Sequence, residues 1–121
     1  MPPAGSLSEI EHYERADVHK GFECTLTENS HGEAPGWRVT TIFYSALHVV
    51  SAYLARQGMY PKDHPERGKM LAKDHKGRTI SSSYETLQGW SKASRYELGG
   101  ISDAQIAAAH LILAKIESAL K

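Results

Sequence analysis

Apolar side chains recur with helical spacing through the middle of the chain, from about Trp37 to Gln57. Because residues three and four apart share one face of a helix, these side chains fall into two adjacent stripes. The stripes together make one wide apolar face, formed by Ile42, Ala46, Val49 and Tyr53 and by Phe43, Leu47, Val50 and Leu54. The pattern predicts a central helix that contacts several other helices and ends at Gly58.

A third side of the same segment is polar or small, and it carries Arg38, Thr41, Ser45, His48 and Ala52. His48 therefore lies on neither apolar stripe. Small residues allow a close approach, so this face is expected to meet another helix, a second protomer, or the loop that carries His64 and Arg67. Of these three neighbours we favour the loop.

Four further helices are predicted, and no strand is. The first starts at a capping box formed by Ser6 and Glu9 and runs to about Thr27. Its apolar positions form an imperfect stripe of Ile10, Tyr13, Ala16, Phe22 and Leu26. The next is a short helix over residues 64–75, capped by Asp63 or His64, with Pro65 in its first turn and Gly77 at its end.

The last two helices have clear apolar sides. One runs from about Ile80 to Tyr96 with Tyr84, Leu87, Ser91 and Ser94 on one side. The other starts at a capping box of Ser102 and Gln105 and carries Ile106, Ala109, Leu113, Ile116 and Leu120 in register. Short connections between helices predict an all-α, antiparallel up-and-down bundle of four to five helices. We expect a single domain over residues 1–121, with residues 1–5 as a disordered lead-in.

Composition narrows the class of protein. The 14 basic and 14 acidic side chains of the 121 residues cancel, so no overall charge attracts nucleic acid or membrane. The one cysteine fits a reducing compartment, and the N-terminus has no signal-peptide pattern. No apolar run reaches the ~20 residues of a membrane span. These features predict a cytoplasmic protein without a membrane partner.

Most catalytic and cofactor motifs are missing from the sequence. It contains no phosphate-binding loop, no dinucleotide fingerprint and no paired zinc-binding histidines on one helix. A single cysteine rules out a cysteine-based zinc site. We therefore expect neither a metal nor another cofactor.

The strongest candidate chemistry lies in the segment DHPER, where His64 and Arg67 are three residues apart at the start of a helix. That spacing turns both side chains to one side. A guanidinium binds phosphate through two hydrogen bonds, and an imidazole beside it can move a proton. The alternative is that His64 caps the helix while Arg67 forms a surface ion pair with Asp63. His12 and His19, beside Arg15, are expected to be solvated.

Three segments in this order, FYSALHVVSAYL, GMYPKDHPER and YETLQGWSKASRYE, followed by a capped amphipathic helix, resemble the HEPN superfamily of small helical domains. The resemblance is closest to a bacterial branch with an F-Y-x-A-L-H helix, an H-x-x-R helix start and an S-x-x-x-R-Y helix. It covers about residues 7–120. The matching positions with candidate roles are Tyr44, His48, His64, Arg67, Tyr84, Arg95 and Tyr96.

The resemblance implies a bundle that often pairs as a symmetric dimer. HEPN proteins include metal-independent endoribonucleases of defence systems. Others are non-catalytic RNA- or nucleotide-binding modules, often beside a nucleotidyltransferase, so the resemblance implies one of these two functions. Catalytic members carry an Arg and a His separated by four to six residues. Here Arg15 and His19 have three residues between them, while Arg56 to His64 and Arg67 to His75 each have seven, so no catalytic motif transfers.

Together, these observations predict a HEPN-like domain that interacts with RNA or nucleotide phosphates in a prokaryotic defence or toxin–antitoxin setting, including metal-independent RNA cleavage. The candidate catalytic residues are His48, His64 and Arg67, and the candidate phosphate-binding residues are Arg67, Arg95 and Tyr44. Expected partners are RNA or a nucleotide, a second copy of the chain, and a nucleotidyltransferase or an antitoxin. The alternative is a non-catalytic interaction or dimerisation module, antitoxin-like or regulatory, that uses the face from Arg38 to Ala52.

Overall fold

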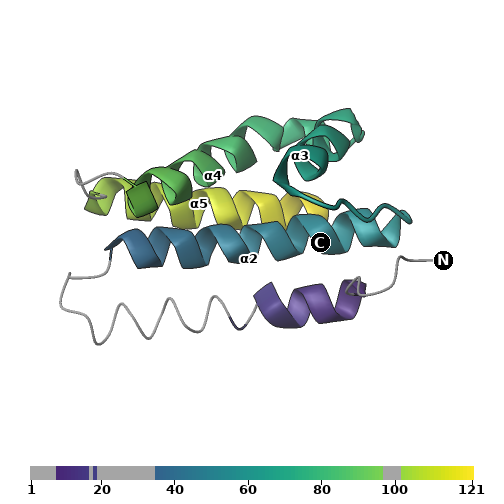
Figure 1. Ribbon diagram of the computed structural model, residues 1–121, viewed down its shortest axis with the longest axis horizontal. Coiled ribbons are helices and arrows are strands. Elements are labelled where there is room, and N and C mark those ends of the chain that lie inside the picture. The colour runs from purple at the N-terminus through teal and green to yellow at the C-terminus, as the bar shows by residue number, and fades with distance from the viewer. Residues whose placement is uncertain (1–7, 17, 19–34, 97–101) are drawn as a thin grey trace.

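A computed structural model describes the backbone of residues 8–16, 18, 35–96 and 102–121, and these residues form helices and turns without a strand. The helices are a short N-terminal helix, helical at residues 9–16, followed by α2 (Pro35–Arg56), α3 (His64–Lys73), α4 (Ser81–Tyr96) and α5 (Asp103–Leu120). A single 3-10 turn, η1 (Gly77–Thr79), joins α3 to α4 (Figure 1). The all-helical class predicted from the sequence is confirmed for the described residues.

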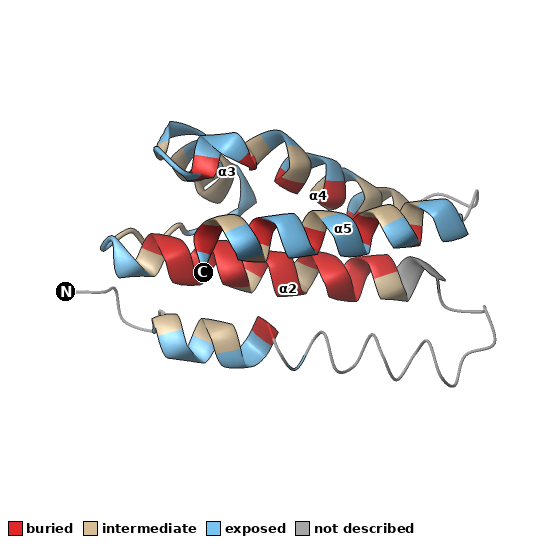
Figure 2. Cartoon of the chain, turned by 180° about the vertical axis from the view of Figure 1, so that it is seen from behind, coloured by how far each residue is buried: buried red, intermediate tan, exposed pale blue. Residues whose placement is uncertain are grey.

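Helix α2 is the centre of the molecule, in contact with α3, α4 and α5 (Figure 1). Both predicted apolar stripes are buried along their whole length. The third, polar side is largely buried as well, because Thr41, Ser45 and Ala52 are covered (Figure 2). A helix buried on nearly all sides gives its few polar groups defined partners inside the protein.

The helix starts largely follow the local capping signals. The Asp63 carboxylate accepts a hydrogen bond from the Glu66 amide at 2.9 Å, so Asp63 rather than His64 caps α3. The predicted capping box of Ser102 and Gln105 is present at α5, and all five residues predicted for its apolar side are buried.

The start of the N-terminal helix corrects a prediction. The reciprocal cap forms between Ser8 and Glu11, because the Glu11 amide donates to Ser8 Oγ and the Ser8 amide donates to Glu11 Oε1. Glu9, expected in the capping box, instead binds Arg56 of α2. Ser6 and the predicted continuation over residues 19–27 lie outside the described residues.

The N-terminal helix lies along α2 (Figure 1). Ala16 is buried, and its carbonyl accepts a hydrogen bond of 2.9 Å from Ser45 Oγ. Ile10, predicted as part of an apolar stripe, is 70% exposed, and Val18 is 69% exposed. The stripe prediction is therefore wrong at Ile10, because the helix turns Glu9, His12, Tyr13 and Ala16 toward the rest of the protein instead.

The connection from α3 to α4 is built around Asp74. This residue ends α3, so the helix stops before the predicted residue 75. Its carboxylate accepts hydrogen bonds from the Tyr53 hydroxyl at 2.6 Å and from the amides of Lys76 and Gly77 at 3.0 and 2.8 Å. Gly77, predicted to end the helix, is instead a buried residue that begins η1.

In the described part of the chain, no helix is long and apolar enough to cross a membrane.

Candidate functional site

Arg67 is the centre of the candidate site. The Asp63 cap fixes the first turn of α3, and this places His64 and Arg67 on one side, one helical turn apart. Arg67 Nε donates to Ser51 Oγ of α2 at 3.0 Å, and one terminal nitrogen donates to His64 Nδ1 at 3.3 Å. The Tyr84 hydroxyl of α4 is a third polar partner, near enough for Arg67 to act on its pKa. Groups from three helices therefore surround this one side chain.

All three partners of Arg67 are neutral groups, so none of them cancels its positive charge. Over residues 8–16, 18, 35–96 and 102–121, no carboxylate forms an ion pair with Arg67. The alternative expectation, a surface ion pair with Asp63, is therefore wrong, because that carboxylate is engaged in capping α3. A half-buried guanidinium that lacks a counter-charge is a favourable place for an anion.

Aromatic rings of the core pack beside His64 and Arg67. Tyr84 is buried, and burial raises the pKa of its hydroxyl to about 12 even though the nearby Arg67 guanidinium acts in the opposite direction. Tyr84 therefore stays neutral at physiological pH. The buried Phe43 ring lies 5.7 Å from the Tyr84 ring and 5.9 Å from the His64 ring, between centroids. This packing keeps His64 beside Arg67.

His48 is half-buried and pairs with a histidine of the N-terminal helix. Its Nδ1 lies 2.8 Å from Nδ1 of His12, and the two ring centroids are 5.1 Å apart. One ring donates and the other accepts, so the neutral pair contains two different tautomers. With Ser45 bound to the Ala16 carbonyl, this side of α2 meets another helix at both positions, rather than the loop that we favoured.

The charge of Arg67 acts on the pair formed by His12 and His48. Burial lowers the pKa of His12, and the positive charges of Arg67 and Arg15 lower it further, while Glu11 acts in the opposite direction. His12 is half-buried, so the expectation that it is solvated is wrong. The available signal was the i, i+4 spacing of His12 and Ala16, which places both on the buried face of the helix.

The structure thus joins some candidates and leaves others apart. His64 and Arg67 are in contact, and His48 connects to them through His12 and the charge of Arg67. Tyr44 packs beside Phe43, with ring centroids 5.5 Å apart. Arg95 lies in α4, and its side chain is outside the described residues. Sequence reasoning missed Ser51, His12 and Arg15, which lie far from Arg67 along the chain.

No group of three or more potential metal-ligating side chains gathers anywhere in the described ranges. The functional groups of the site are imidazoles, a guanidinium and hydroxyls, which can bind an anion and move protons.

Comparisons with protein-family models, with curated proteins and with solved structures find no match to this chain.

Proposed function

We propose that this chain is a HEPN-like helical domain that binds the phosphate groups of RNA or of a nucleotide at Arg67. One observation carries the proposal: Arg67 is a half-buried guanidinium that donates to Ser51 and His64 beside the Tyr84 hydroxyl, and no described carboxylate forms an ion pair with it. A guanidinium has five N–H donors, so these two hydrogen bonds leave donors for a phosphate oxygen. The fixed position lowers the entropy lost when the anion binds.

The HEPN-like, antiparallel up-and-down bundle is part of this proposal. Its support is the order of the three sequence segments, together with the helices of the described residues, among which α2 packs against three others. The prokaryotic defence or toxin–antitoxin setting, the single-domain organisation, the homodimer and a nucleotidyltransferase or antitoxin partner rest on the sequence alone.

The same groups are suited to metal-independent cleavage of RNA. In that reaction one imidazole accepts the proton of the 2′-hydroxyl while its oxygen bonds to phosphorus. The bond from phosphorus to the 5′-oxygen breaks, and a second imidazole gives that oxygen a proton. Arg67 would stabilise the negative charge on the phosphoryl oxygens. His64, which lies beside Arg67, and His48 are the two imidazoles for these roles.

Binding of a fluorophore-labelled, single-stranded RNA tests the proposal. We expect Arg67→Gln to weaken binding by roughly tenfold or more, the usual loss for a charge-assisted hydrogen bond. Loss of one phosphate contact should also reduce the slope of log affinity against log salt by about 0.7. Arg78→Gln, which removes an exposed cation on η1, is the matched control and should change affinity little. Equal affinities for wild type and Arg67→Gln would refute the site.

Cleavage is measured separately, with a chelator present. The proposed reaction gives products with a 2′,3′-cyclic phosphate and a 5′-hydroxyl, and their formation should be lost in His64→Asn and in His48→Asn. If RNA binds through Arg67 and no cleavage occurs, the domain is a binding module rather than an enzyme.

The alternative, an interaction or dimerisation module, requires a different surface from the one that the sequence suggested. Ser45 and His48 of the predicted interface contact the N-terminal helix, and Thr41, Ser45 and Ala52 are buried. The observation that favours this alternative lies on α5, where Leu111 is 73% exposed. A dimer that Leu111→Glu dissociates, combined with RNA binding indifferent to Arg67, would select the module.

A further inference from the structure

The N-terminal helix brings two cationic or protonatable groups to the candidate site. His12 and Arg15 are three residues apart on this helix, one turn from each other. His48, which binds His12 at 2.8 Å, and Ser51, which binds Arg67 at 3.0 Å, are three residues apart on α2, so His12 and Arg67 contact neighbouring turns of one helix. In keeping with this placement, the charges of Arg67 and Arg15 lower the pKa of His12. The imidazole pair of His12 and His48 is therefore placed in the positive potential of two guanidinium groups that come from different helices.

His12 and Arg15 each have nitrogen atoms that can form further hydrogen bonds. The bond between Nδ1 atoms occupies one nitrogen of His12, and no partner within the described stretches of chain engages its Nε2. Arg15 is exposed and makes neither a hydrogen bond nor an ion pair with any residue that the structure describes. When the imidazole pair takes up a proton, the His12 Nε2 carries a hydrogen, and together with the exposed Arg15 guanidinium it is suited to a negatively charged ligand.

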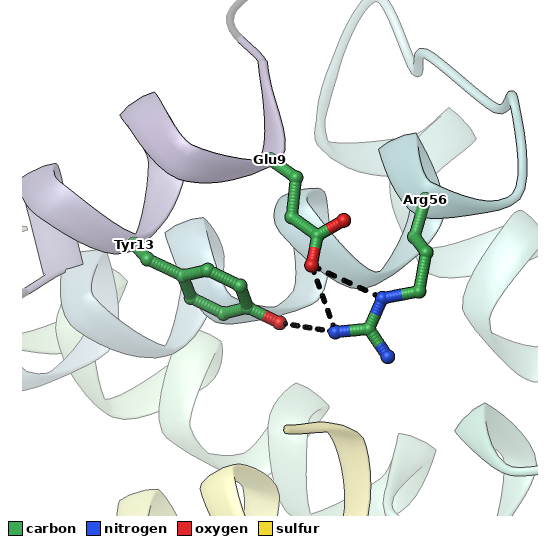
Figure 3. A network of polar contacts seen from close by, with 3 residues as sticks. All are labelled: Glu9, Tyr13 and Arg56. Carbon is green, nitrogen blue, oxygen red and sulfur yellow. Dashed lines mark hydrogen bonds and ion pairs between the residues drawn. The ribbon is translucent and has the colours of Figure 1, made fainter.

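The position of His12 is fixed before any ligand arrives. Arg56 of α2 donates from Nε and from one terminal nitrogen to Glu9 Oε1, at 3.1 and 2.9 Å, and from that terminal nitrogen to the Tyr13 hydroxyl at 2.8 Å (Figure 3). The Lys121 ammonium lies 5.3 Å from the centroid of the Tyr13 ring. Glu9 lies one turn before His12 and Tyr13 directly follows it, so these contacts hold the imidazole against α2.

We propose that His12 and Arg15 complete the phosphate site of Arg67, so that a phosphodiester bound there is held from two sides and its binding takes up a proton on the His12–His48 pair. This inference rests on the proposed function, because it needs RNA to bind at Arg67. It adds two residues of the N-terminal helix to the site and makes affinity dependent on pH.

The direction of the pH dependence follows from the charges around the pair. His12 is faced by Glu11 and Arg15 from its own helix, by His48 from α2 and by Arg67 from α3. Without a ligand, burial and the two cations lower the pKa of His12 and so favour its neutral form. A bound phosphodiester adds a negative charge that favours the imidazolium. Binding and proton uptake are therefore linked, and affinity rises as pH falls from 8 to 6.

The test uses a short oligouridylate with hydroxyl ends, because none of its groups titrates between pH 6 and 8. Its affinity for the full chain is measured at several pH values across this range. For the wild type we expect binding to be about tenfold tighter at pH 6 than at pH 8, corresponding to uptake of part of one proton. His12→Asn keeps a polar side chain that cannot titrate, and it should lose this pH dependence, so that its binding at pH 6 is no tighter than at pH 8.

Matched controls separate a role in binding from a role in structure. His110→Asn removes an exposed histidine of α5 and should leave the pH profile unchanged. Arg15→Gln should weaken binding several-fold at every pH, whereas Arg78→Gln should not. If His12 only holds the helix in place, His12→Asn will weaken binding equally at pH 6 and pH 8, and the inference fails.

The outcomes also separate this inference from the proposed function. If the wild type binds no RNA, or binds it independently of Arg67, the proposed function is refuted and the inference with it. If Arg67→Gln abolishes binding while His12→Asn and Arg15→Gln match the wild type at every pH, only the inference is overturned.

Discussion

A methyl group added at Gly77 tests how tightly the turn between α3 and α4 is packed. This turn determines how Arg67 of α3 lies relative to Tyr84 of α4. Gly77 lies in the turn between α3, which carries Arg67, and α4, which carries Tyr84. A Cβ atom there would overlap the carbonyl oxygen of Leu71 and lie 2.7 Å from Leu71 Cδ1 and 3.2 Å from Asp74 Cβ. Leu71 is fully buried, and its carbonyl accepts the Asp74 amide at 3.2 Å, so neither group can move away cheaply.

The magnitude follows from two opposing effects. Overpacking a tight site costs roughly 1–3 kcal/mol, and contact with a backbone carbonyl puts Gly77→Ala toward the upper end. Alanine also restricts the unfolded chain, which stabilises the folded state by about 0.4–1 kcal/mol. We therefore expect Gly77→Ala to lower the free energy of unfolding by about 2 kcal/mol. Gly89→Ala, in α4, is the matched control, because its Cβ would meet nothing within 4 Å. We expect it to raise the free energy of unfolding by about 0.5–1 kcal/mol.

Urea unfolding followed by far-ultraviolet circular dichroism measures both variants. If the m value is unchanged, the shift in midpoint reports the change in stability. The two variants should move the midpoint in opposite directions. A Gly77→Ala protein as stable as the wild type, or a Gly89→Ala protein destabilised as much as Gly77→Ala, would refute the packing described for this turn.

Three further predictions concern the contacts that hold the N-terminal helix and the turn. Tyr53→Phe should cost about 1–2 kcal/mol in urea unfolding, because it removes the hydroxyl that donates to Asp74 at 2.6 Å; an unchanged midpoint would contradict that bond. Burial raises the pKa of Asp74, but hydrogen bonds from Tyr53 and the Gly77 and Lys76 amides outweigh it and bring the pKa below its ordinary 3.8. The stability contributed by this carboxylate is therefore complete above about pH 4 and is lost as pH falls through the lowered pKa, so Asp74→Asn should differ most from the wild type near pH 6 and least near pH 2. Glu9→Gln should cost at most about 1 kcal/mol, because the ion pair with Arg56 is partly exposed, and amide hydrogen exchange should show faster opening of residues 9–16 while α5 is unaffected.

The helices that the sequence predicts best are those with strong local signals. In α2 and α5 the apolar spacing continues for several turns, and Gly58 and the Ser102 capping box mark an end and a start. The N-terminal helix was harder, because Ser6 with Glu9 and Ser8 with Glu11 both have capping-box spacing. The choice between them depends on Arg56, which takes Glu9 as its partner from 47 residues away. No local rule contains that information.

In the candidate site, too, the local contact was predicted and the contacts between distant residues were not. The pairing of His64 with Arg67 follows from a separation of three residues at a capped helix start, and it was predicted. The other contacts join residues far apart in the chain: Arg67 with Ser51 at a separation of 16, and His12 with His48 at a separation of 36. Such contacts depend on how whole helices pack, so one sequence gives no means of ranking them.

The central claim, that Arg67 receives a phosphate, is tested most directly on its own guanidinium. The Nε–H group of Arg67 gives a nuclear magnetic resonance signal that can be followed while the short oligouridylate is added, and the exposed Arg78 serves as the internal reference. We predict that the Arg67 signal shifts until it saturates, with the same midpoint as the binding curve, and that the Arg78 signal moves little. Saturable RNA binding that leaves the Arg67 signal in place would contradict the account.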